Sequence, residues 1–162
     1  MMATMGTVAA PKRQSGPHIW YTDSGTSDHF SPHKQLFTTL RKLEEPICIE
    51  TAEGIAIETG IGTITITVLG KNDIDTELQL NNVVYTPSMI SNLFSLMAAY
   101  DKGYETRIAL GCGLRVFHRE TIIAHSVRVT GGLFRLKTPT DAFAYVAQVS
   151  ETTPELDVNV WH

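Results

Sequence analysis

The chain of 162 residues contains only two cysteines, Cys48 and Cys112, too few for a disulfide framework. Such sparse cysteine use is typical of a reducing compartment, although a single bridge between the two thiols is an alternative. No apolar run approaches the roughly 20 residues that a bilayer span requires, and the N-terminus lacks the apolar core of a signal peptide. We therefore expect a cytoplasmic protein that does not enter a membrane.

The chain also has few positively charged residues. The 13 Lys and Arg are outnumbered by 17 Asp and Glu, which gives a net charge of −4, and the basic residues are scattered along the chain. This balance lacks the electrostatic footprint of a protein that binds nucleic acid or an anionic membrane. The sequence thus argues against direct nucleic-acid and membrane partners.

The 43% of apolar residues is enough for one domain with a core, and the patterning predicts a mostly β fold with one helix. The clearest strand is 62–69, where Thr and aliphatic residues alternate. A helix is expected to begin at Ser91 or Asn92 and to end before Gly103. Its apolar face would carry Leu93, Leu96, Met97 and Tyr100. The other predicted strands are 19–22, 47–50, 55–57, 76–80, 83–85, 104–110, 114–118, 121–124 and 133–136, with 30–40 as an irregular connection.

The stretch 20–29 contains the best candidate for chemistry. Strand-forming residues run directly into Asp23-Ser24-Gly25, so the carboxylate is expected where a strand breaks into a loop. The glycine lets the backbone turn, the hydroxyls of Ser24 and Thr26 can hydrogen-bond the loop, and no Lys or Arg lies within several positions of the acid. An aspartic peptidase needs such an unpaired carboxylate. The alternative is an ordinary turn, because Asp, Ser and Gly all favour turns.

Two histidines close to this stretch, His29 and His33, are four residues apart and could in principle bind a metal. No helical context or nearby cysteine supports a metal site. We therefore interpret both as solvated loop side chains and predict no metal and no cofactor.

Seven short motifs, in this order and spacing, make the sequence resemble the protease region of a copia-type retrotransposon polyprotein. They are 20–29 (WYTDSGTSDH), 51–54 (TAEG), 60–63 (GIGT), 83–87 (VVYTP), 91–95 (SNLFS), 102–104 (KGY) and 131–136 (GGLFRL). The resemblance implies a retropepsin-like closed β-barrel with one helix, in which the active site forms at the two-fold axis of a homodimer.

The sequence also calls for a second chain. Asp23 is the only Asp that is followed by Ser or Thr and then Gly, so one chain supplies half of a site that uses two carboxylates. Asp23 from each of two chains would lie about 3 Å apart and share a proton. One carboxylate would then activate a water while the other polarises the scissile carbonyl. This reaction requires neither metal nor cofactor.

The resemblance assigns further roles to single residues. Ser24 and Thr26 would brace the loop across the dimer axis and hydrogen-bond the carboxylates, and Gly25 would offer its carbonyl to the substrate backbone. The implied substrate-binding residues are Ser27, Asp28, Thr51, Ala52, Glu53 and Gly54. The last four would form the tip of a flap hairpin that closes over an extended peptide. An ordinary meander is the alternative for this hairpin, and 60–62 is a second candidate for the flap tip.

These observations predict a flexible leader or linker at 1–17, a retropepsin-like aspartic protease domain at 18–137, and a tail at 138–162 that leads towards an integrase region. The expected function is an aspartic endopeptidase that processes the Gag-Pol polyprotein of its own element, in the cytoplasm or within virus-like particles. The alternative function is a catalytically silent or domesticated dimeric module that binds a peptide without cutting it.

Overall fold

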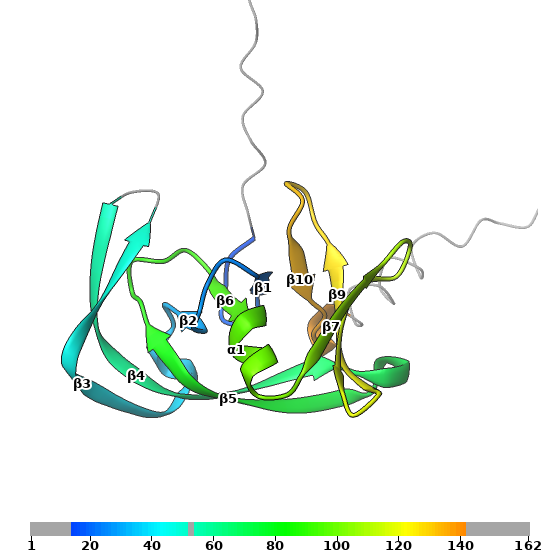
Figure 1. Ribbon diagram of the computed structural model, residues 1–162, viewed down its shortest axis with the longest axis horizontal. Coiled ribbons are helices and arrows are strands. Elements are labelled where there is room, and N and C mark those ends of the chain that lie inside the picture. Colours follow the sequence, from blue (N-terminus) through cyan, green and yellow to red (C-terminus); the bar gives the residue numbers. More distant parts are fainter. Residues whose placement is uncertain (1–13, 52–53, 142–162) are drawn as a thin grey trace, which may run out of the picture.

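The computed structural model describes residues 14–51 and 54–141, which contain ten strands, the short α-helix α1, two 3₁₀ turns and a further helical stretch at 139–141 (Figure 1). The strands are β1 Trp20–Asp23, β2 Phe30–Ser31, β3 Phe37–Thr51, β4 Gly54–Leu69, β5 Asp75–Tyr85, β6 Asn92–Ser95, β7 Glu105–Ala109, β8 Gly113–His118, β9 Thr121–Arg128 and β10 Phe134–Leu136. The helix α1 spans Leu96–Asp101, and the 3₁₀ turns η1 and η2 span Lys34–Leu36 and Lys71–Asp73. The prediction of a mostly β fold is confirmed for the described residues, but the prediction of a single helix is not, because residues 139–141 are helical as well as α1.

The strands are ordered β3-β4-β5-β2-β6-β1-β10-β9-β8-β7 in one mixed sheet. The pairs β1–β6 and β2–β5 are parallel, and the other neighbours are antiparallel. The expected closed barrel is not what this order describes, because the sheet ends at β3 and β7 and these two strands are not neighbours in it. Figure 1 gives the reason: the long strands β3 to β5 carry one end of the sheet to the left side of the molecule, and β7 lies on the right.

The core lies against the curved middle of the sheet. In β4 the alternation predicted from the sequence is realised, because Ile64, Ile66 and Val68 are buried while Thr65 and Thr67 face water. Burial of an aliphatic side chain of this size contributes about 1.5–3 kcal/mol. The same core cluster contains residues from β1, β5, β6, α1, β8, β9 and β10: Trp20, Leu78, Leu80, Val83, Phe94, Ala99, Leu114, Val116, Ala124 and Leu136.

The helix prediction is wrong at its start. Leu93 belongs to β6, whose parallel pairing with β1 extends to Ser95, and α1 begins only at Leu96. Ser95 is the N-cap, because its side chain accepts a hydrogen bond from the Ala98 backbone N–H. The predicted apolar face is also wrong, since Met97 is 47% exposed and Tyr100 is 69% exposed.

Two other segments differ from expectation. The stretch 30–40 is not irregular throughout, since it contains β2, η1 and the start of β3 at Phe37. The glycines at 60–62 do not form a turn and lie inside β4, which excludes them as a flap tip. Gly62 is needed there because a Cβ atom would collide with the Thr39 carbonyl at the point where the β3–β4 register shifts.

Candidate functional site

Asp23 ends β1, a strand held on both sides in the middle of the sheet. β1 pairs in parallel with β6, where Asp23 lies opposite Ser95, and antiparallel with β10. Trp20 and Tyr21, which precede it, are 1% and 3% exposed, whereas Asp23 itself is half-buried. The strand is therefore anchored by two aromatic side chains, and the carboxylate emerges where pairing stops, as the sequence predicts.

The loop after Asp23 turns back on the carboxylate. The Gly25 backbone N–H donates a 2.7 Å hydrogen bond to Asp23 Oδ1, and a Cβ at Gly25 would lie 3.2 Å from the same oxygen. A side chain at this position would crowd the carboxylate, which explains the glycine. Asp23 forms no ion pair with any described residue. The carboxylate is therefore not neutralised by a basic side chain of the described residues.

Ser95 connects this loop to helix α1. Its Oγ donates a 2.5 Å hydrogen bond to the Thr26 carbonyl and accepts a 3.0 Å hydrogen bond from the Ala98 N–H. Ser95 is completely buried. One hydroxyl therefore caps the helix and fixes the loop, so the loop is positioned by the helix N-terminus.

His29 holds the far end of the loop and is not the solvated side chain that the sequence suggested. It is only 6% exposed, its ring lies 4.9 Å from the Phe94 ring, and its Nδ1 accepts a 2.9 Å hydrogen bond from the Ser95 N–H. Burial lowers the pKa of His29 to about 4, against the opposing effect of the Asp28 carboxylate. The ring is thus neutral at physiological pH, with its proton on Nε2, and acts as a backbone acceptor.

The other predicted loop residues occupy different environments. Ser24 is exposed, and the buried Thr26 Oγ1 has no hydrogen-bond partner among the described residues, so neither hydroxyl braces the Asp23 carboxylate within this chain. The Ser27 hydroxyl donates a 2.8 Å hydrogen bond to Asp28 Oδ2. Both residues line a pocket of about 420 Å³ between the loop, α1 and β5, and Asp23 is not among its lining residues.

The predicted flap is the β3–β4 hairpin, in which Thr51 pairs with Gly54. Ala52 and Glu53 lie outside the described residues. Figure 1 shows the hairpin as an arm at the edge of the molecule, and β5, β2 and β6 separate β4 from β1 in the sheet. The single chain therefore does not bring Asp23 and the hairpin together as neighbouring strands.

The two faces of this arm differ. Ile55 and Ile57 are 72% and 65% exposed on one face, while Glu58 on the other face is only 5% exposed. Burial raises the pKa of Glu58, and a hydrogen bond from the Ser88 side chain opposes this effect. The exposed isoleucines give the arm an apolar outer surface close to its tip.

Clusters of three or more His, Cys, Asp or Glu side chains that could hold a metal ion do not occur in the described part of the chain. The Nδ1 atom of His29 accepts a hydrogen bond from the Ser95 N–H, so this nitrogen is not free to bind a metal together with His33. Among the described residues, none of the helices has the length and apolar character needed to cross a bilayer.

Comparisons with known proteins place this site in a family. Residues 20–104, just over half of the chain, match the model of the "Pol polyprotein, beta-barrel domain". Searches of curated proteins and of solved structures find no match. The matched range contains the Asp-Ser-Gly loop, the β3–β4 hairpin and α1. The chain therefore belongs to the family of β-barrel domains found in the Pol polyproteins of retroelements.

Proposed function

We propose that this domain is the aspartic endopeptidase of a copia-type retrotransposon and that it processes the element's own Gag-Pol polyprotein. The observation that carries the proposal is the position of Asp23, a half-buried carboxylate without an ion-pair partner among the described residues, at the end of an anchored strand. Its loop is fixed on both sides, by Ser95 at the Thr26 carbonyl and by His29 at Ser95. Such rigidity suits a group that must be held in position for reaction.

The chemistry requires a homodimer of retropepsin-like subunits. Asp23 from each subunit would meet at the two-fold axis, and the pair would hold one proton between two like charges. The ionised carboxylate takes a proton from water as the water attacks the scissile carbonyl, and the protonated one donates to the carbonyl oxygen. As the C–N bond breaks, the newly protonated carboxylate gives its proton to the leaving amine, and the other carboxylate takes a proton from a hydroxyl of the gem-diol intermediate, which regenerates the shared-proton state.

The remaining site residues take supporting roles in this proposal. Ser24 and Thr26 hydrogen-bond across the subunit boundary, Gly25 offers its carbonyl to the substrate, and Ser27 and Asp28 border the substrate. In the dimer the 51–54 hairpin closes over an extended peptide and adds main-chain hydrogen bonds to it. The exposed Ile55 and Ile57 would lose their contact with water on closure.

The test replaces Asp23 by Asn, which preserves the size of the side chain but removes the base. The variant and the wild type are incubated with peptides that span the linkers of the element's polyprotein, and products are measured by mass spectrometry. We expect at least a 10³-fold loss of cleavage, comparable to the removal of other essential catalytic groups, with unchanged folding and dimerisation. The matched control is Asp75→Asn, which removes an exposed carboxylate at the start of β5.

Two results would contradict the proposal. Cleavage by Asp23→Asn at the wild-type rate would exclude Asp23 as the catalytic acid. Tight binding of the same peptides by the wild type, without any cleavage between acid and neutral pH, would support the dimeric peptide-binding module instead.

A further inference from the structure

The C-terminal strands are strongly basic, so the expectation that basic residues are scattered is wrong. Residues 102–137 contain seven of the 13 Lys and Arg and only two Asp or Glu, whereas 20–101 contains four Lys or Arg and eleven Asp or Glu. The net charge of the whole chain conceals this separation. Strands β7 to β10, which carry the positive charge, also lie outside the range that matches the family.

Three of these cations line one pocket. It has a volume of about 850 Å³ and lies between the β7–β8 turn, β9, β10 and η2. Arg115 comes from β8, Arg128 ends β9, and Lys137 follows β10. Asp73 carries the only carboxylate among the described residues of the lining, and it lies 3.8 Å from the Lys137 ammonium.

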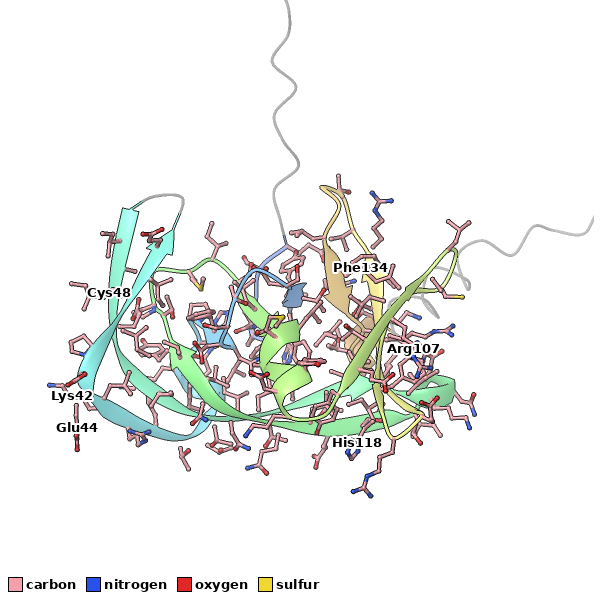
Figure 2. All side chains as sticks on the ribbon, in the orientation of Figure 1. Lys42, Glu44, Cys48, Arg107, His118 and Phe134 are labelled. Carbon is pink, nitrogen blue, oxygen red and sulfur yellow. The ribbon has the colours of Figure 1, made fainter. Side chains whose placement is uncertain are left out.

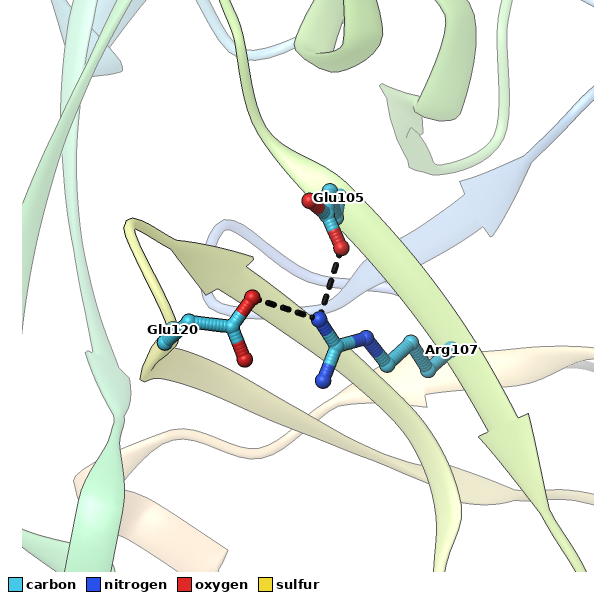
Figure 3. Close-up of polar contacts among 3 residues, drawn as sticks. All are labelled: Glu105, Arg107 and Glu120. Atoms are coloured by element: carbon cyan, nitrogen blue, oxygen red, sulfur yellow. Dashed lines mark hydrogen bonds and ion pairs between the residues drawn. The ribbon is translucent and has the colours of Figure 1, made fainter.

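The charges in this pocket are not neutralised as they are elsewhere in the same strands. Figure 3 shows Arg107, which donates to Glu105 at 2.8 Å and to Glu120 at 3.0 Å. Arg135 likewise pairs with Asp141 at 2.8 Å. Arg115 and Arg128, by contrast, form no ion pair with any described residue. The pocket therefore holds an excess of positive charge.

Polar groups in the pocket wall also lack partners. Ser126 is 2% exposed and lines the pocket, and its Oγ has no hydrogen-bond partner among the described residues. The buried Nε of Arg115 likewise has no hydrogen-bond partner among the described residues. Buried polar groups are usually hydrogen-bonded, so residues of this wall hold polar atoms that the described residues leave unsatisfied.

His125 reports the electrostatics of the pocket. Burial lowers the pKa of His125, and the charges of Arg115 and Lys137 lower it further. The Asp73 carboxylate and a hydrogen bond to the Gly70 backbone act in the opposite direction. These groups from β8, η2 and the segments after β4 and β10 are close enough to shift the pKa of the His125 imidazole. An anion bound among them should therefore shift this pKa as well.

We propose that this pocket binds a phosphate oxyanion. Two Arg side chains without ion-pair partners among the described residues, together with Lys137, match the charge of a phosphate group, which can accept several hydrogen bonds at once. A ligand with a single carboxylate group would leave most of the positive charge of the pocket unpaired. The wall formed by Ile108, Leu110 and Phe134 would contact the rest of the ligand, and Figure 2 shows Phe134 on the side of β10 near this region. The phosphate can come from a free phosphorylated compound or from the backbone of single-stranded nucleic acid.

The first measurement uses inorganic pyrophosphate with the full chain in a phosphate-free buffer. Binding is followed by the NMR titration of His125, whose pKa should rise because the ligand neutralises Arg115 and Lys137. Arg115→Gln and Lys137→Gln should each weaken binding about tenfold, the usual loss for one charge-assisted hydrogen bond. The control Arg41→Gln removes the same charge from β3, at the other end of the sheet, and should leave the affinity unchanged.

The second measurement separates the two sources of phosphate. If a single-stranded oligothymidylate displaces pyrophosphate and itself raises the His125 pKa, the source is a nucleic-acid backbone, and the affinity should fall steeply with salt. If pyrophosphate binds and the oligonucleotide does not displace it, the source is a small phosphorylated compound. An unchanged His125 titration with both probes would overturn the proposal. Stronger binding of an acidic peptide than of pyrophosphate, or an equal loss in Arg41→Gln, would overturn it as well.

Discussion

The two side chains that position the Asp23 loop, Ser95 and His29, are neutral and buried, whereas the ion-paired side chains along β7 and the β8–β9 turn are charged and exposed. Ser95 and His29 are 0% and 6% exposed and bind backbone groups of the candidate site. Arg107, Glu105 and Glu120 make their ion pairs in contact with solvent, with side-chain exposures of 47%, 61% and 77%. The conformation of the Asp23 loop should therefore depend on pH and on single hydrogen bonds. The interactions of the C-terminal strands should instead depend on salt and on anions.

The largest expected effect is the acid sensitivity of the Asp23 region, which follows from His29. The pKa of His29 is about 4 in the folded protein and 6.5 in its ordinary state, so the unfolded chain takes up a proton first as the pH falls. The contribution of His29 to stability is therefore constant above pH 6.5, decreases between pH 6.5 and about 4, and then levels off. A shift of this size corresponds to about 3 kcal/mol of unfolding free energy.

Urea unfolding at a series of pH values measures this slope. His29→Asn should flatten it, because the Asn carbonyl can accept from the Ser95 N–H but does not titrate. The control His18→Asn replaces an exposed histidine and should keep the wild-type slope. An unchanged slope in His29→Asn would mean that another group is responsible for the acid sensitivity.

The second effect in size is the loss of the Ser95 hydroxyl. Ser95→Ala removes a helix cap and leaves the Thr26 carbonyl without its donor, which should destabilise the protein by about 2 kcal/mol. Peptide cleavage should fall as well, because the loop that holds Asp23 loses its attachment to α1. Ser15→Ala, at an exposed position ahead of β1, is the control for both measurements. Equal stability of the two variants would show that the loop is held by other contacts.

The smallest effect is expected for the exposed ion pairs. Arg107→Gln removes both pairs, and the midpoint of urea unfolding should barely move because solvent and salt already screen exposed charges. The Arg107 guanidinium also lies 4.2 Å from the centre of the Phe117 ring, so any remaining change should persist at high salt. A large loss of stability in Arg107→Gln that disappears at high salt would contradict this prediction. The exposed ion pairs would then stabilise the protein as much as the buried contacts near Asp23 do.

The parts of the fold that follow from local sequence could be predicted. Alternation alone identifies the buried face of 62–69. The strand-to-loop position of Asp23 is also local, because it depends on neighbouring strand formers and on Gly25. These features need no information from distant segments.

The parts that depend on contacts between distant segments could not be predicted. The helix start was misplaced because Leu93 lies in a strand that pairs with β1, some 70 residues earlier in the sequence. His29 was expected in water because nothing beside it shows that Phe94 covers its ring. The clustered positive charge is different, since a count within 102–137 reveals it and the whole-chain balance does not.

The open end of the sheet at β3 has a consequence for how this protein behaves at high concentration. An uncovered edge strand can template the addition of another chain. Within β3 the run 41–46 contains Arg41, Lys42, Glu44, Glu45 and Pro46, and Figure 2 shows Lys42 and Glu44 on its outer side. Charged side chains and a residue without an N–H resist edge-to-edge pairing, and the register with β4 shifts at the same place. The middle of the edge is therefore protected against aggregation, and the unprotected part is the apolar segment from Ile47 towards the hairpin tip.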